Sequence, residues 1–184
     1  MERNEENKGA AEERKKASCP RVGGKGSNKI VVVLWVTLLL GGVSLLMHFQ
    51  QKRQAEAERL LNEAYALYGQ QEFEASTDRL RQSAELGNVW AQLYYGERLR
   101  TGFAAEQNTS EAVKWLRKAA KQECSEAFYQ LGMCYENGEG VERNLDEAEK
   151  LYRKASEDPA FAALARISLE RIESLKPETP PAAN

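Results

Sequence analysis

Arg81-Gln82-Ser83-Ala84 returns as Arg117-Lys118-Ala119-Ala120 and again as Arg153-Lys154-Ala155-Ser156, 36 residues further along the chain each time. Other positions keep the same spacing, among them Gly96 and Gly132. A fixed period of this length predicts a stack of repeated helical units rather than one globular domain. Each unit of such a stack packs only against its neighbours, which leaves an extended surface free for binding.

The composition favours helix and disfavours nucleic-acid binding. Ala, Glu, Leu, Lys and Arg dominate, and the chain has only five prolines. Residues 50–184 carry 18 Lys and Arg against 23 Asp and Glu, a net charge of −5. Affinity for nucleic acid depends on clustered Lys and Arg, so we expect no nucleic-acid partner.

One uncharged stretch precedes the repeats. Residues 30–47 read IVVVLWVTLLLGGVSLLM, and a helix of this length just crosses a hydrocarbon core of about 30 Å. We therefore predict a single-pass transmembrane helix at residues 30–48. A cleaved signal peptide is the alternative, but the 29 preceding residues and the long apolar run argue against it.

The cations on the two sides of this segment predict its orientation. Six Lys and Arg lie within the twenty residues before it and three within the twenty after it. Excess positive charge marks the cytoplasmic side, so residues 1–29 are predicted to be a disordered basic cytoplasmic tail and the repeats extracytoplasmic. The small size and the lack of a cysteine framework favour a bacterial inner membrane, with the repeats facing the periplasm. Residues 176–184 are predicted to be a disordered tail.

Thr37, Gly41 and Ser44 fall on one face of the predicted membrane helix. Small residues on such a face let a second membrane helix approach closely, so this face is a candidate for packing in a homo- or hetero-oligomer. Ordinary contact with lipid is the alternative.

Glycine and proline residues that end helices, and N-cap residues that begin them, predict the remaining helices, which form a repeat region over residues 49–175. We expect helices at 50–68, 72–86, 89–101, 108–122, 125–137, 144–157 and 160–175. Asn108 and Asn144 are each followed three residues later by Glu, which predicts reciprocal capping boxes.

The third unit carries the most specific pattern. It reads Ala127-x₃-Leu131-Gly132-x₂-Tyr135-x₂-Gly138-x-Gly140-Val141, followed by Asp146-x-Ala148-x₂-Leu151-Tyr152-Arg153-Lys154-Ala155. This closely resembles the Sel-1-like repeat, the longer-looped relative of the tetratricopeptide repeat. The preceding unit agrees less well, since Phe103-Ala104-Ala105 replaces the Gly-x-Gly-Val loop, and residues 55–87 resemble an ordinary tetratricopeptide repeat. The resemblance covers residues 55–175 and implies an all-α fold, an α-solenoid of helix pairs.

We identify no catalytic, cofactor-binding or metal-binding residue and expect neither an enzyme nor a cofactor. The repeat region contains no His, the commonest general base and metal ligand. Some secreted Sel-1-like proteins pair two cysteines within each repeat. Cys124 and Cys134 lie ten residues apart on a predicted helix, a separation of about 13 Å, which is too far for a disulfide.

The resulting functional hypothesis is a membrane-anchored adaptor or scaffold whose groove binds a segment of a partner protein on the extracytoplasmic side. In repeat stacks the first helix of each pair usually lines the concave side. The candidate groove residues are Tyr94, Glu97, Tyr129, Gln130 and Met133. For Tyr129, a contact between repeats is the alternative.

Two other functions remain open. Some Sel-1-like proteins have been described as β-lactamases or cell-wall binders, which suggests a cell-envelope hydrolase or cell-wall-binding protein. The absence of a Ser-x-x-Lys motif argues against the hydrolase. The third possibility is an assembly subunit of a membrane complex that acts through its transmembrane helix.

Overall fold

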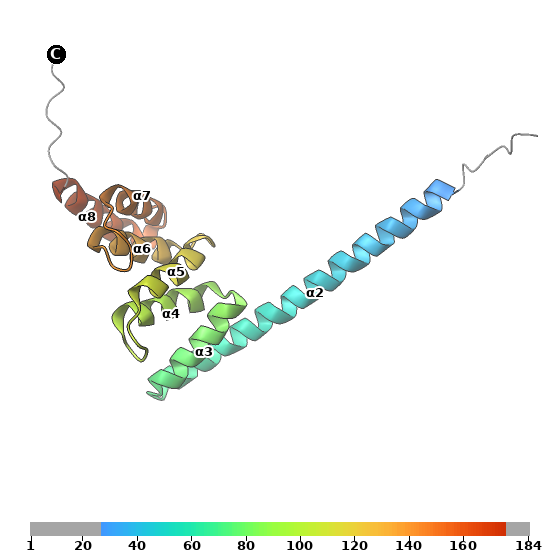
Figure 1. Ribbon diagram of the computed structural model, residues 1–184, viewed down its shortest axis with the longest axis horizontal. Coiled ribbons are helices and arrows are strands. Elements are labelled where there is room, and N and C mark those ends of the chain that lie inside the picture. Colours follow the sequence, from blue (N-terminus) through green and yellow to red (C-terminus); the bar gives the residue numbers. More distant parts are fainter. Residues whose placement is uncertain (1–26, 176–184) are drawn as a thin grey trace, which may run out of the picture. The chain divides into compact units, whose positions relative to one another are not determined.

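Seven helices and no strand make up residues 27–175, the part of the chain that the computed structural model describes; side chains are described from Gly41 to Leu175. Figure 1 shows the helices in chain order. Their bounds are α2 Ser27–Gly69, α3 Phe73–Leu86, α4 Val89–Thr101, α5 Thr109–Ala120, α6 Ser125–Asn137, α7 Leu145–Ala155 and α8 Pro159–Leu175. The predicted all-α fold is confirmed.

The chain divides into two compact units, residues 1–48 and 49–184, and the division falls inside α2. The second unit contains all the helix pairs. Helix α4 begins 36 residues before α6, and α5 begins 36 residues before α7, so the helices follow the sequence period. Most contacts between helices join neighbours in this order, as expected for a helical-repeat stack, and α6 also contacts α8.

Among the residues that the structure describes, no helix is long and apolar enough to cross a membrane. The predicted transmembrane segment at 30–48 is helical, beginning at Ser27, but its side chains before Gly41 lie outside the described residues. The predicted membrane packing face consisted of Thr37, Gly41 and Ser44. The side chain of Thr37 is not among those described, and Gly41 and Ser44 are exposed. The predicted tail at residues 176–184 also lies outside the described residues, as do residues 1–26 of the predicted tail 1–29, whereas residues 27–29 begin α2 and are helical.

Two apolar cores hold the repeats together. The first joins α2, α3, α4 and α5, and includes Leu61, Leu80, Tyr95 and Trp115. The second runs from α4 to α8 and includes Tyr152, which is fully buried. Helix α4 contributes to both cores, which makes the repeat region continuous.

Small residues allow the helices of a pair to approach closely, as the sequence predicts. A Cβ atom at Gly132 would lie 2.8 Å from Cε1 of Tyr152, and one at Gly96 would lie 3.2 Å from Cγ of Leu116. The alanines on the facing helices, Ala112 and Ala148, are fully buried.

The predicted capping boxes form only in half. The side chains of Asn108 and Asn144 accept hydrogen bonds of 3.0 Å from the backbone N–H groups of Glu111 and Glu147. The reciprocal bond is replaced, because the N–H of each asparagine donates instead to a carbonyl of the preceding helix, at 2.8 Å for Asn108 and 2.9 Å for Asn144. The cap thereby ties the second helix of a pair to the first.

A buried carboxylate fixes the last helix. Arg171 on α8 donates to both oxygens of Glu136 on α6, at 2.6 and 2.8 Å, and the hydroxyl of Tyr152 on α7 donates to the same carboxylate at 2.7 Å. We call Glu136, Tyr152 and Arg171 the Glu136 cluster. It joins three helices at the C-terminal end of the repeats.

Candidate binding groove

The structure separates the five predicted groove residues into two sets. Tyr94 and Glu97 on α4 are half-buried and line a pocket, as described below. On α6, the ring of Tyr129 lies 5.3 Å from that of Tyr152, Gln130 is buried, and Met133 packs against the second core. These three residues take part in packing among the helices, and Tyr129 also contacts Phe161 of α8 at 6.2 Å, in line with the alternative considered for it.

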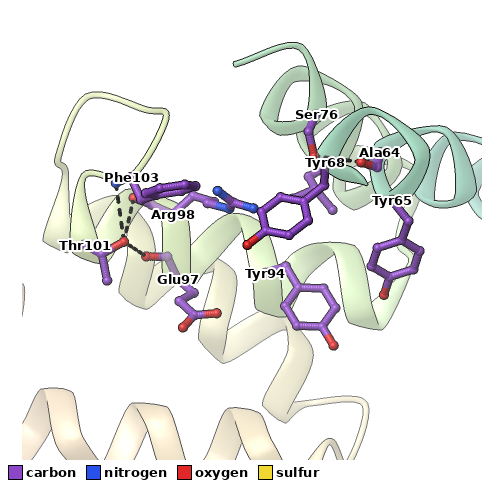
Figure 2. A pocket seen from close by; sticks show the side chains of 10 residues that line it. Ala64, Tyr65, Tyr68, Ser76, Tyr94, Glu97, Arg98, Thr101 and Phe103 are labelled. Carbon is purple, nitrogen blue, oxygen red and sulfur yellow. Dashed lines mark hydrogen bonds between the residues drawn. The ribbon is translucent and has the colours of Figure 1, made fainter. Parts of the chain in front are cut away.

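A pocket of about 440 Å³ lies between α2 and α4. Figure 2 shows its lining, with Tyr65 and Tyr68 on α2 facing Tyr94 and Arg98 on α4. Its other lining residues are Ala64, Ser76, Leu80, Glu97, Thr101 and Phe103. We call this pocket the α2–α4 groove.

The floor of the α2–α4 groove is apolar, and the hydroxyl groups of Ser76 and Thr101 in its lining both form hydrogen bonds. Ala64 and Leu80 are buried. The hydroxyl of Ser76 donates to the carbonyl of Ala64 at 2.8 Å, and the hydroxyl of Thr101 donates to the carbonyl of Glu97 at 2.9 Å. Neither hydroxyl therefore faces a base that could activate it as a nucleophile.

Aromatic side chains form the walls and rim. Tyr65, Tyr68, Trp90 and Phe103 each keep between 45% and 49% of their surface exposed. The rings of Tyr65 and Tyr94 meet edge to face at 6.2 Å, and Trp90 stacks on Tyr94 at 6.3 Å. Burial, the main cause, raises the pKa of Tyr94 to about 12, so its hydroxyl is neutral throughout the physiological pH range.

Arg98 lies between two of these rings (Figure 2). Its Cζ atom is 5.1 Å from the centre of the Tyr68 ring and 4.4 Å from that of Phe103. The Nη1 atom is buried and has no hydrogen-bond partner among the described residues. Burial lowers the pKa of the guanidinium, although an arginine remains charged at neutral pH.

The loop after α4 positions Phe103. Gly102 ends the helix with a φ of 74°, and Ala104 has a φ of 54°, which side chains with a Cβ rarely adopt. In the next repeat, Glu139 is equivalent to Phe103 and Gly140 is equivalent to Ala104. Gly140 has a φ of 72°. This repeat thus keeps the backbone turn of the Gly-x-Gly-Val loop of the next repeat but places an aromatic ring over the groove.

Sequence reasoning identified Tyr94 and Glu97 but missed Tyr65, Tyr68 and Arg98. The replacement of the family loop by Phe103-Ala104-Ala105 was visible in the sequence and was the one available signal. It marked a repeat that had changed its loop residues without losing its helices.

The part of the chain that the structure describes contains no group of three or more His, Cys, Asp or Glu that could hold a metal ion. Cys124 and Cys134 are both free thiols, as expected from their separation. Burial raises the pKa of Cys134 to about 11, which keeps this thiol protonated and unreactive at neutral pH.

Comparison with known proteins agrees with the helical-repeat architecture. Residues 91–124 and 125–158 each match the Sel1 repeat family. No curated protein matches the sequence. The crystal structure of c5321, a protective antigen of uropathogenic Escherichia coli with an SLR fold, has a TM-score of 0.62 and 26% identity, over 68% of this chain and 27% of that one.

Two further solved structures are similar. A Sel1 repeat protein from Oxalobacter formigenes is 33% identical, over 53% of this chain and 39% of that one, with a TM-score of 0.49. Cysteine rich protein B of Helicobacter pylori is 18% identical, over 66% of this chain and 94% of that one, also with a TM-score of 0.49. The chain spans 27% and 39% of the length of the first two proteins. Residues 91–158 therefore match two Sel1 repeats, a repeat type whose proteins are generally protein-interaction scaffolds, and the c5321 structure has a similar fold.

Proposed function

We propose that this chain, which carries two Sel1 repeats, binds a segment of a partner protein in the α2–α4 groove and acts as a membrane-anchored adaptor. The groove is the site of recognition, and the remaining helices hold it in shape. The partner is a protein because the groove offers apolar walls, a single cation and no reactive group.

The observation that carries this proposal is the exposure of the aromatic residues around the groove. Four large rings retain nearly half of their surface in solvent, although buried positions in both cores lie close by. Exposed apolar surface gathered around a concavity is typical of protein-binding sites, and Tyr and Trp are the residues most often found at their energetic centres.

The lining of the groove favours binding over hydrolysis. Its ionisable side chains are Tyr65, Tyr68, Tyr94, Glu97 and Arg98. Ser76 and Thr101 donate their hydroxyl protons to backbone carbonyls, so neither is paired with a general base. A nucleophile beside a base is the arrangement that a hydrolase of the cell envelope requires.

The membrane anchor and its orientation rest on the sequence. Eighteen uncharged residues at 30–47 and the excess of Lys and Arg before them support a single-pass helix with the repeats on the extracytoplasmic side. Extraction of membranes with alkaline carbonate should leave the full-length chain in the pellet, and its release into the supernatant would contradict the anchor.

Site-specific crosslinking tests the groove. A photoreactive residue is introduced into the full-length chain at Trp90, on the groove rim, or at Ile167, an exposed residue of α8 that serves as the control site. We expect crosslinking to a defined protein from position 90 and not from position 167. We also expect the crosslink to disappear in a Tyr65→Ala, Tyr94→Ala variant that melts at the same temperature as the parent chain. Equal crosslinking from both positions, or a crosslink that survives the double substitution, would refute the groove.

A further inference from the structure

We infer that the partner segment presents an acidic side chain to Arg98, next to an apolar residue that packs against the groove tyrosines. This inference rests on the proposed function, because it specifies what the groove recognises. It follows from the surroundings of one guanidinium.

Arg98 lies against two aromatic rings and forms no ion pair within 4 Å among the described residues. Its Cζ atom lies over the rings of Tyr68 and Phe103, and its buried Nη1 atom has no hydrogen-bond partner among the described residues. Glu97, the adjacent carboxylate, points away from it (Figure 2). A positioned fork of N–H donors without an acceptor is suited to bind a planar carboxylate edge-on.

Other arginines of the same repeats show what is missing. Arg171 contacts both carboxylate oxygens of Glu136. The Nη1 atom of Arg100 lies 3.3 Å from Oε2 of Glu139, although its Nε atom is buried without a hydrogen-bond partner among the described residues. Leaving a buried donor unpaired is unfavourable, whereas hydrogen bonds to charged groups are among the strongest that a protein makes. A carboxylate from outside the chain would therefore gain more at Arg98 than at an arginine that is already paired.

The charge of the lining selects a carboxylate over a phosphate. Within the part of the chain that the structure describes, Arg98 is the only cation that lines the groove, and Glu97 places a negative charge in the same wall. A phosphate group, with a charge of about −2 at neutral pH, would meet one positive and one negative group. A carboxylate carries a single charge that Arg98 alone can match.

The approach to Arg98 favours a side chain over a chain end. Tyr68 and Phe103 lie on two sides of the guanidinium, 5.1 and 4.4 Å from its Cζ atom, which narrows the route of access to it (Figure 2). The narrow methylene stem of Asp or Glu fits such an approach. The neighbouring residue of the segment then lies over Tyr65 and Tyr94, whose rings form the apolar wall.

The probe is a displayed library of random twelve-residue segments joined to carrier protein at both ends, so that no free terminal carboxylate is present. Selection against the full-length chain in detergent should enrich Asp or Glu beside an aromatic or large aliphatic residue. Selection against Arg98→Gln should lose the acidic preference. In the parent chain, replacing the selected acidic residue by its amide should weaken binding by about 10- to 100-fold, as expected for one charged hydrogen bond.

Matched variants separate the possible outcomes. Arg166→Gln removes the same charge from an exposed arginine of α8, and it should leave the selection and the affinity unchanged. The losses of binding free energy caused by Arg98→Gln and by the amide substitution in the segment should not add when the two are combined, because each removes the same contact.

Three results would overturn the inference. Enrichment of apolar segments that depends on Tyr65 and Tyr94 but not on Arg98 would leave the groove in place and remove the acidic partner. A parallel library of segments with free carboxyl ends is also selected. If only these segments bind, and they show no preference for Asp or Glu, Arg98 recognises a terminal carboxylate and not an acidic side chain. Enrichment that is insensitive to Arg98→Gln and to Tyr65→Ala, Tyr94→Ala alike would remove the groove itself.

Discussion

Gly132 stands where the first helix of the third repeat crosses the second. A methyl group on its Cα would lie 2.8 and 2.9 Å from two ring carbons of Tyr152, which is itself fully buried and cannot move aside. We expect Gly132→Ala to lower the free energy of unfolding by about 1–3 kcal/mol, the usual range for overpacking a core. Chemical denaturation of the full-length chain, followed by circular dichroism, measures this change.

Gly69, at the end of α2, provides the control for this substitution. A Cβ atom there would meet nothing within 4 Å, so Gly69→Ala should change the stability by less than about 0.5 kcal/mol. Equal effects of the two substitutions would contradict the role of the crossing, because the gain in helix propensity from Gly to Ala is common to both and cannot cause a loss.

Ala104 and Gly140 occupy equivalent positions in the loops of two repeats. Both have a positive φ, but only Ala104 carries a Cβ atom. Ala104 has a φ of 54°, a region in which a Cβ atom is unfavourable by about 1 kcal/mol, and Ala104→Gly should therefore stabilise the chain by about that amount. Gly140 has a φ of 72°, and a Cβ atom there would lie 2.2 Å from the carbonyl oxygen of Thr109, so Gly140→Ala should destabilise it by more. Melting temperatures of the two single variants test both signs, and a loss of stability in Ala104→Gly would contradict the argument.

Residue patterns predicted which side chains pack, but not which side chains form the groove. Gly96 and Gly132 keep the 36-residue period, and in the structure each of them faces a bulky residue of the next helix, Leu116 and Tyr152. Tyr65 and Arg98 were missed because no repeat shares them, and their meeting depends on how α2 packs against α4. A period reveals what repeats have in common, whereas a binding site is built from what one repeat does differently.

At the scale of elements, caps and breakers predicted the helices closely. Helices α4 and α6 have the predicted bounds at 89–101 and 125–137, whereas α5 and α7 each end two residues early. The ends differ because Lys121 and Ser156 close the helices without a glycine, so the sequence offered no left-handed stop signal there. The continuous α2 follows from the lack of any Pro or Gly between residues 43 and 68.

The Glu136 cluster makes the attachment of α8 dependent on pH. The ion pair with Arg171, chiefly through its hydrogen bonds, holds the pKa of Glu136 below its ordinary value of 4.5. A carboxyl whose pKa is lowered by folding stabilises the folded state above its unfolded pKa, and this contribution is lost as the pH falls through the folded value. The attachment of α8 should therefore be complete at neutral pH and weaken progressively below about pH 4.5.

Comparison of the parent chain with Glu136→Gln tests this dependence. At pH 7 the variant should be less stable by about 1–3 kcal/mol, because hydrogen bonds to a charged acceptor are replaced by bonds to a neutral one. At pH 3 the difference should shrink, and hydrogen exchange should report faster opening of α8 in both chains. Arg166→Gln, which breaks only an exposed pair at 3.9 Å, should change neither quantity. A stability difference that stays constant from pH 7 to pH 3 would contradict the assignment of the effect to the charge of Glu136.

At the scale of the whole molecule, the proposed binding site and the cluster that stabilises the last helix lie at opposite ends of the helical stack. The groove lies in the first helix pairs, and the Glu136 cluster fixes the last three helices. Because units in a stack contact only their neighbours, a change at one end should leave the other end largely unaffected. Variants of the groove and of the Glu136 cluster can therefore be interpreted separately.

The predicted topology can be tested with the chain's own cysteines. Cys19 belongs to the segment predicted to be cytoplasmic, and Cys124 and Cys134 belong to the repeats. In a chain carrying Cys124→Ser and Cys134→Ala, Cys19 should resist a membrane-impermeant maleimide in intact cells from which any outer barrier has been removed, and it should react after lysis. When Cys19→Ser and Lys121→Cys are added, the exposed position 121 should react before lysis. Labelling of Cys19 in intact cells would show that the N-terminal segment is extracytoplasmic and that the predicted orientation is wrong. Protection of both sites would place the repeats in the cytoplasm, away from any extracytoplasmic partner.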